Sequence, residues 1–254
     1  MKLLDKLYEK SHMTFAIVWI VAYVLAASVA DGISQDLGVI KLITAPVLIV
    51  MSVLLWAWVR HAQLEGLFFM GAPTVPAARL LFYLPLAIVA TKKIWLGMTA
   101  NGTALECVCW VVSMVGVGFL EEIIFRGLLF RAIDEDSRVQ AIVISSITFG
   151  LGHIVNLFNT SGQGLVPTLG QIVFAVGVGF MMVEVMLKSG SIWPCIIFHM
   201  VNNALTIFED EAAGLALFGT AEMAIIVSVG TGALISLAYV AYLAKALPDA
   251  EQAR

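Results

Sequence analysis

The stretch ALECVCWVVSMVGVGFLEEIIFRGLLF, residues 104–130, decides the fold class of this chain. It is long and apolar enough to cross a bilayer, because a transmembrane helix needs about 20 mostly apolar residues. Its C-terminal part nevertheless carries three charged residues, Glu121, Glu122 and Arg126. Charges at bilayer depth are costly and usually serve a function. The stretch therefore predicts a membrane helix that carries a functional site.

The rest of the chain repeats the apolar pattern. The 254 residues are 61% hydrophobic and only 13% charged, whereas soluble domains carry about 25% charged residues. Seven further windows are long enough to span a membrane: 13–31, 40–60, 78–99, 139–159, 168–188, 190–208 and 221–246. We therefore predict an all-α polytopic bundle of about eight transmembrane helices, forming one integral membrane domain over residues 1–254.

Orientation follows from the basic residues, which collect in cytoplasmic loops. With eight spans, the N-terminus, every second connection and the C-terminal tail lie on one side of the membrane. The basic residues on this side are Lys2, Lys6, Lys10, Arg60, Arg79, Arg126, Arg131, Arg138, Lys188, Lys245 and Arg254. The other side receives Asp31, Asp36 and residues 209–211, all acidic. We expect both termini in the cytoplasm. Lys92 and Lys93 do not follow this pattern. Either their side chains extend to the outer membrane interface, or the bounds predicted for the third span are wrong. No basic stripe indicates a nucleic-acid partner.

The two adjacent glutamates have different prospects. Neighbouring residues on a helix point about 100° apart, so Glu121 and Glu122 cannot do the same job. Glu122 and Arg126 lie four residues apart on one face and can form a self-compensating ion pair. Glu121 has no opposite charge one turn away. It must therefore face protein or a water-filled cavity, and it is the better candidate for a working carboxylate.

Two later windows carry polar residues at comparable depth. His153 lies in ITFGLGHIVN, and His199 shares a helix face with Asn203 in IIFHMVNNAL. From the rise per residue, Glu121, His153 and His199 lie roughly 16, 21 and 13 Å from the cytoplasmic ends of their helices. Each histidine alone could simply bond a neighbouring helix. Together with Glu121, they are compatible with one shared site in the cytoplasmic half of the membrane.

This set of side chains suits hydrolysis without a protein nucleophile. A carboxylate, alone or with an imidazole, can take a proton from water. An imidazole and an amide can donate hydrogen bonds to the oxyanion that forms on an attacked carbonyl. Glu121, His153 and His199 could also bind zinc, since two histidines and a glutamate form a known catalytic zinc set. No HExxH motif is present. The sequence leaves a zinc cofactor and a metal-free mechanism both open.

Three ordered motifs resemble one known family. They are EExxxR (Glu121 to Arg126), FxxxH (Phe149 to His153) and HxxxN (His199 to Asn203), on three separate predicted helices. This order resembles the type II CAAX prenyl endopeptidases and their bacterial relatives, the Abi or CPBP family of intramembrane proteases. The motif-bearing core is 104–208.

The resemblance implies an eight-helix fold with a conical cavity open to the cytoplasm and to lipid. It implies cleavage of a peptide bond in a membrane-associated protein or peptide, with CAAX-type C-terminal processing as one form. By motif position, Glu121 resembles the base that activates water, assisted by His153, while His199 and Asn203 resemble the oxyanion site. Glu122, Arg126 and Phe149 resemble supporting residues. The family has been called metalloprotease, and the metal-free glutamate mechanism is the one we favour. The short chain favours a bacterial inner membrane.

Two other functions compete with proteolysis. A small-solute or proton-coupled transporter could relay protons through Glu121, Glu184 and the histidines. No inverted repeat, a common feature of transporters, is visible in the sequence. A non-catalytic scaffold or immunity protein could instead bind a partner within the bilayer. The presence of Glu121, His153, His199 and Asn203 argues against this alternative.

Overall fold

The computed structural model describes residues 1–76, 78–158 and 163–250, and the regular structure in these ranges is helical, as the sequence predicted. Six helical segments are long and apolar enough to cross a membrane. They are α2 (His12–Asp36), α3 (Thr44–His61), the continuous segment Ala104–Asp134, the segment Arg138–Leu157, α8 (Leu165–Ser189) and α11 (Ala221–Ala246).

The two remaining predicted spans contain shorter helices. In window 78–99, α4 (Leu80–Thr91) ends well before the predicted boundary. A 3₁₀ turn, η1 (Lys92–Ile94), follows it. Its lysines bond to other helices, since Lys92 Nζ donates to Ser228 Oγ at 2.8 Å and Lys93 pairs with Glu209 at 2.5 Å. The predicted third span, 78–99, is therefore longer than the helix that it contains. The contacts with Ser228 and Glu209 explain why Lys92 and Lys93 depart from the distribution of the other basic residues.

Window 190–208 contains α9 (Trp193–Ala204) and a 3₁₀ turn, η4 (Leu205–Phe208). The structure also contains two short helices that the windows did not include, α1 (Lys2–Lys10) and α10 (Glu211–Phe218). Six of the eight predicted spans thus correspond to helices long and apolar enough to cross a membrane within the described residues.

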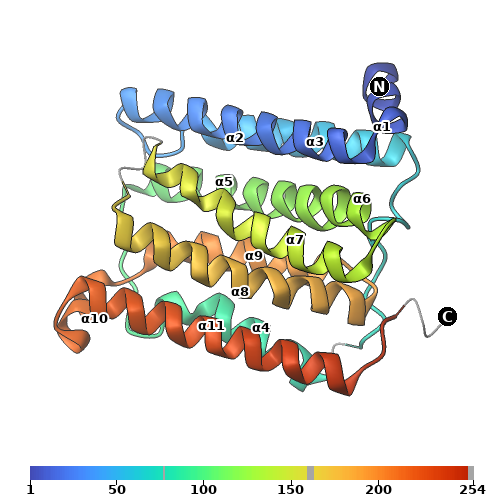
Figure 1. The fold of residues 1–254 in the computed structure, drawn as a ribbon. Helices are drawn as coiled ribbons and strands as arrows, with labels where there is room; N and C mark the ends of the chain where they lie inside the picture. Colours follow the sequence, from blue (N-terminus) through green and yellow to red (C-terminus); the bar gives the residue numbers. More distant parts are fainter. Residues whose placement is uncertain (77, 159–162, 251–254) are drawn as a thin grey trace.

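The helices stack in layers (Figure 1). α2 and α3 form one outer layer, and α11 and α4 lie on the opposite side. Between them lie α5 (Ala104–Glu122) with its continuation α6 (Phe130–Asp134), then α7 (Arg138–Leu151), α8 and α9. The helix α1 and the C-terminal end of α11 lie at the same end of the bundle. The three motif-bearing helices, α5, α7 and α9, therefore all lie between the two outer layers.

Glycines allow the motif-bearing helices to approach their neighbours closely. A Cβ atom at Gly118 of α5 would lie 2.8 Å from the backbone nitrogen of Met200 in α9. A Cβ at Gly150 of α7 would lie 2.9 Å from the backbone nitrogen of Val176 in α8. Small residues at such crossings let helix backbones pack tightly in membrane proteins. The contact at Gly118 sets the distance between α5 and α9, and the contact at Gly150 sets the distance between α7 and α8.

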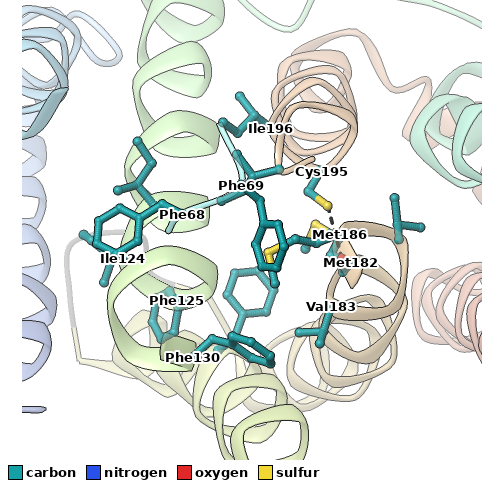
Figure 2. Packing of buried hydrophobic residues seen from close by; sticks show 14 of the residues in the cluster. Phe68, Phe69, Ile124, Phe125, Phe130, Met182, Val183, Met186, Cys195 and Ile196 are labelled. Carbon is teal, nitrogen blue, oxygen red and sulfur yellow. Dashed lines mark hydrogen bonds between the residues drawn. The ribbon is translucent and has the colours of Figure 1, made fainter. Parts of the chain in front are cut away.

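A cluster of buried apolar side chains packs beside the second half of the long segment Ala104–Asp134 (Figure 2). Phe68 and Phe69, from the α3–α4 connection, insert next to Ile124, Phe125 and Phe130. Met182, Val183 and Met186 of α8 and Cys195 and Ile196 of α9 complete the cluster from the other side. This packing holds the segment just beyond Glu121 and Glu122 rigidly against α8 and α9.

Candidate active site

The two glutamates lie where α5 changes its helical form. α5 ends at Glu122, and residues Ile123–Leu129 form a π-helix, η2, before α6 continues the segment. Short π-helical insertions frequently occur at functional sites. The wider π-helical turn contains Arg126, and η2 is entirely buried. The first motif therefore occupies a local irregularity of the longest membrane helix.

The predicted ion pair between Glu122 and Arg126 is present. Arg126 Nη1 lies 3.4 Å from Glu122 Oε1, and neither side chain is exposed. The guanidinium also stacks over Phe149 of α7, with Cζ 4.1 Å from the ring centroid. A buried charge pair of this kind is costly to break, because the remaining partner is left uncompensated. Phe149 thus links the first motif to the second.

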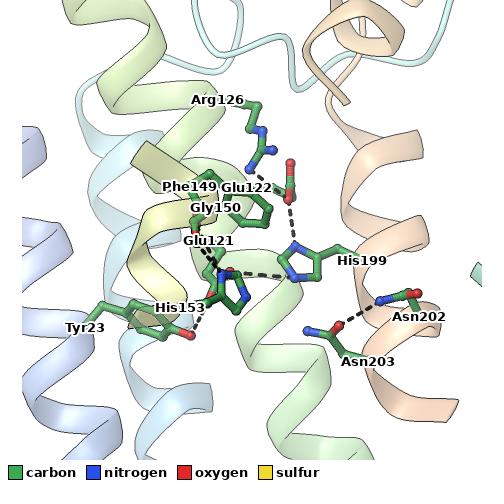
Figure 3. A network of polar contacts seen from close by, with 10 residues as sticks. All are labelled: Tyr23, Glu121, Glu122, Arg126, Phe149, Gly150, His153, His199, Asn202 and Asn203. Atoms are coloured by element: carbon green, nitrogen blue, oxygen red, sulfur yellow. Dashed lines mark hydrogen bonds and ion pairs between the residues drawn. The ribbon is translucent and has the colours of Figure 1, made fainter. Parts of the chain in front are cut away.

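His199 lies between the two neighbouring carboxylates (Figure 3). Its Nδ1 is 2.7 Å from Glu122 Oε1, and its Nε2 is 3.7 Å from Glu121 Oε2. The imidazole is buried, with only 4% of its surface exposed. Adjacent side chains on a helix diverge, which was expected to separate the roles of the two acids. Here the divergence places the carboxylates of Glu121 and Glu122 at opposite edges of the His199 ring. Glu122 therefore contacts His199 as well as Arg126.

His153 is held by the backbone of its own helix. It lies in η3 (Gly152–Leu157), and its Nδ1 is 3.2 Å from the Phe149 carbonyl oxygen and 3.3 Å from that of Gly150. Because a carbonyl oxygen only accepts hydrogen bonds, Nδ1 must carry the proton. The neutral ring then leaves Nε2 as an acceptor. The Phe149 ring packs edge-to-face against both imidazoles, at 5.6 Å between centroids.

Asn203 is oriented by its neighbour in sequence. The Nδ2 of Asn202 donates to the Oδ1 of Asn203 at 3.0 Å, which leaves the Asn203 amide nitrogen directed toward the two histidines (Figure 3). Trp110 of α5 also donates from Nε1 to the Asn203 carbonyl oxygen at 3.0 Å. Asn202 belongs to none of the three motifs, and as the neighbour of Asn203 it points to a different helix face. The contact between the two amides nevertheless joins Asn202 to the polar cluster.

Tyr23 of α2 is the main residue that the sequence analysis missed. Its hydroxyl donates to Glu121 Oε1 at 2.5 Å, and its side chain is almost fully buried. The only sequence signal was a tyrosine in the middle of an apolar helix, where a buried O–H needs a partner. The identity of that partner depends on the packing of α2 against η2.

Glu184 lies outside this cluster. Its Oε2 is 3.8 Å from Lys188 Nζ, one turn further along α8, and Lys188 also pairs with Asp249 at 2.8 Å. These contacts lie near the end of α8, where the chain turns into α9. A proton relay through Glu121, Glu184 and the histidines finds no support in these contacts.

The donors expected for zinc were Glu121, His153 and His199. Within residues 1–76, 78–158 and 163–250, no group of three histidine, cysteine, aspartate or glutamate side chains could hold a metal ion. As arranged, Glu121, His153 and His199 therefore do not fit a zinc site, and the description metalloprotease has no support.

Comparison with known proteins relates the motif-bearing part of this chain to one family. Residues 103–205 match the family model of the type II CAAX prenyl endopeptidase Rce1-like proteins. The match spans less than half of the chain but contains all seven residues that the motifs singled out. It confirms the family predicted from the motifs: the motif-bearing region belongs to the CAAX protease family, and the chain is an integral membrane protein. No curated protein and no solved structure matches the chain.

Proposed function

We propose that this protein is an intramembrane endopeptidase that hydrolyses a peptide bond of a membrane-associated protein or peptide. The family match supports a protease of the CAAX type. The observation that carries the proposal is the placement of His199 between Glu121 and Glu122, at 3.7 and 2.7 Å. This arrangement joins the first and third motifs into one polar cluster inside a chain that is otherwise strongly apolar.

In the proposed reaction, Glu121 activates the attacking water. Its Oε1 already accepts a hydrogen bond from Tyr23, so Oε2 is the oxygen that takes the proton. The Nε2 of His153, an acceptor in the neutral ring, binds the same water and orients it. The water oxygen attacks the carbonyl carbon of the scissile bond, and the resulting tetrahedral intermediate carries a negative charge on the former carbonyl oxygen.

In the proposed oxyanion site, His199 and Asn203 stabilise that negative charge. For His199 to donate from Nε2 while Nδ1 donates to Glu122, the ring must be an imidazolium. Its charge and that of Arg126 then balance the two carboxylates. The amide nitrogen of Asn203 supplies the second donor. When the carbon–nitrogen bond breaks, the proton held by Glu121 passes to the departing amine, which restores the carboxylate.

The two alternative functions receive less support. The transporter requires a relay that includes Glu184, which pairs with Lys188 instead. A non-catalytic scaffold would not require Nδ1 of His153 and His199 each to be fixed by a defined acceptor. Such orientation is expected where individual ring nitrogens have assigned roles in proton transfer.

The test is a cleavage assay in liposomes with three reporter peptides. They are a fluorescence-quenched peptide with a farnesylated CAAX terminus, the same peptide without the farnesyl group, and a single-span membrane peptide. Mass spectrometry of the products identifies the cleaved bond. We expect the wild-type protein to cleave at least one reporter and the Glu121→Gln protein to be at least about 100-fold slower. Cleavage of none of the three, or equal cleavage by the variant, would count against the proposal.

A further inference from the structure

The helix α2 lies outside the segment that matches the protease family, yet it contributes a side chain to the site. We propose that Tyr23 is a positioning residue that holds the Glu121 carboxylate in its working orientation. This inference rests on the proposed function. It extends the site beyond the three motifs, to a helix that hydropathy alone had described as a simple membrane span.

The contact between Tyr23 and Glu121 has the geometry of a strong hydrogen bond. An ionised carboxylate only accepts, so the phenol donates. The distance of 2.5 Å lies at the short end of the range for O–H donors to charged oxygens. Tyr23 is 8% exposed and the Glu121 side chain 13% exposed, so little water can compete for either group. A donor in this setting also compensates part of the cost of burying the carboxylate charge.

The bond gives each oxygen of Glu121 a separate place. Oε1 is taken by Tyr23, and Oε2 lies 3.7 Å from His199 Nε2, too far for a good hydrogen bond. Without the phenol, the flexible glutamate side chain could rotate closer to His199 and shorten this ion pair to a direct hydrogen bond. That hydrogen bond would engage the proposed base and the proposed oxyanion donor with each other. Tyr23 therefore keeps Oε2 and Nε2 apart and available for water and substrate.

Packing alone does not explain the phenol hydroxyl. The ring of Tyr23 belongs to the buried apolar cluster, and phenylalanine would fill the same volume there. The chain offers a matched control in Tyr83, whose hydroxyl donates to the Val75 carbonyl oxygen at 2.7 Å. Tyr83 lies in α4, away from the three motifs. Both Tyr→Phe changes remove one hydroxyl hydrogen bond, but only one of those bonds reaches Glu121.

The experiment compares Tyr23→Phe, Tyr83→Phe and Glu121→Gln with the wild-type protein in liposomes, using the reporter that the wild type cleaves best. We expect Tyr23→Phe to lower kcat about tenfold or more with KM unchanged, the size expected for a hydrogen bond to a charged group. Tyr83→Phe should keep the wild-type kcat. Thermal unfolding in detergent should show that both Tyr→Phe proteins are folded, with the larger shift in Tyr23→Phe, whose lost bond reaches a charged group.

The outcomes distinguish this inference from the proposed function. If Glu121→Gln is inactive while Tyr23→Phe keeps a kcat within twofold of the wild type, the positioning role is wrong and the protease proposal stands. If Glu121→Gln is as active as the wild type, the proposed mechanism fails and the role of Tyr23 fails with it, whereas a wild-type protein that cleaves no reporter contradicts the proposed function itself. An independent check needs no substrate: a double-mutant cycle on unfolding free energy should show that the Tyr23→Phe and Glu121→Gln effects are not additive. Additive effects would contradict the inference.

Discussion

The Nδ1 of His199 contacts Glu122 Oε1 at 2.7 Å, so the second glutamate of the pair orients the histidine that the first glutamate faces. Glu122 also pairs with Arg126, and both members of that pair are fully buried. One carboxylate thus joins a charge pair within the segment Ala104–Asp134 to the polar face of α9. The two adjacent glutamates thus lie on opposite sides of the same imidazole. In the proposed mechanism, Glu122 orients the ring and Glu121 activates water.

This relationship predicts a strong effect of Glu122→Gln on stability. The change leaves Arg126 as a buried charge without a counter-ion, and such a loss costs about 3–5 kcal/mol. It also weakens the hold on His199, so kcat should fall by about tenfold or more. Thermal unfolding in detergent and the reporter assay measure the two effects. The control is Glu65→Gln, since Glu65 pairs with Arg60 on the surface. A surface ion pair contributes only about 0–1 kcal/mol to stability. Equal stability loss in both variants would contradict the account.

The contact between the two asparagines predicts a graded effect on catalysis. Asn203→Ala removes a proposed oxyanion donor and should lower kcat by about 100-fold or more. Asn202→Ala removes only the hydrogen bond that orients that donor, worth about 1 kcal/mol, so kcat should fall about fivefold. Asn101→Ala, which loses a bond to the Glu209 carbonyl far from the site, serves as control. A loss in Asn202→Ala as large as that in Asn203→Ala would show that Asn202 itself contacts substrate.

The close approach of α5 and α9 predicts that a methyl group at Gly118 separates the two halves of the site. Its Cβ would lie 2.8 Å from the Met200 nitrogen, and overpacking of this kind costs about 1–3 kcal/mol. Because Glu121 and His199 lie on these two helices, Gly118→Ala should reduce both unfolding temperature and cleavage rate. Gly230→Ala in α11 is the matched control, since nothing lies within 4 Å of its added Cβ. Unchanged cleavage by Gly118→Ala would show that the site tolerates a wider helix spacing.

The sequence predicted much of this architecture, because hydropathy and motif order are local properties. The window 221–246 coincides with α11, and the pair Glu122–Arg126 follows directly from helical spacing. The length of α4 was not predictable in the same way. Its end at Thr91 depends on contacts from Lys92 and Lys93 to residues more than 100 positions away. Hydropathy carries no information on such long-range contacts, so the predicted third span extends beyond the end of α4.

The candidate site shows the same limit. The motifs include Glu121, His199 and Asn203, but they include neither Asn202 nor Trp110, which both donate a hydrogen bond to Asn203. Tyr23 was missed because its contact with Glu121 joins positions 98 apart on helices with no shared motif. The contact of Glu122 with His199 was also not predicted, since helical geometry separates the two glutamates but does not show which neighbour each one meets. Long-range packing decides both.

The most direct test of the central claim is the single-turnover cleavage rate of Glu121→Gln in liposomes, beside Glu106→Gln. Glu106 lies at the start of the same helix, and its carboxylate caps that helix through Thr103, so the control changes the same residue type outside the site. The account predicts that Glu121→Gln is folded and at least about 100-fold slower than the wild type, because it cannot take a proton from water. It predicts a wild-type rate for Glu106→Gln. A Glu121→Gln protein that cleaves at the wild-type rate would contradict the account.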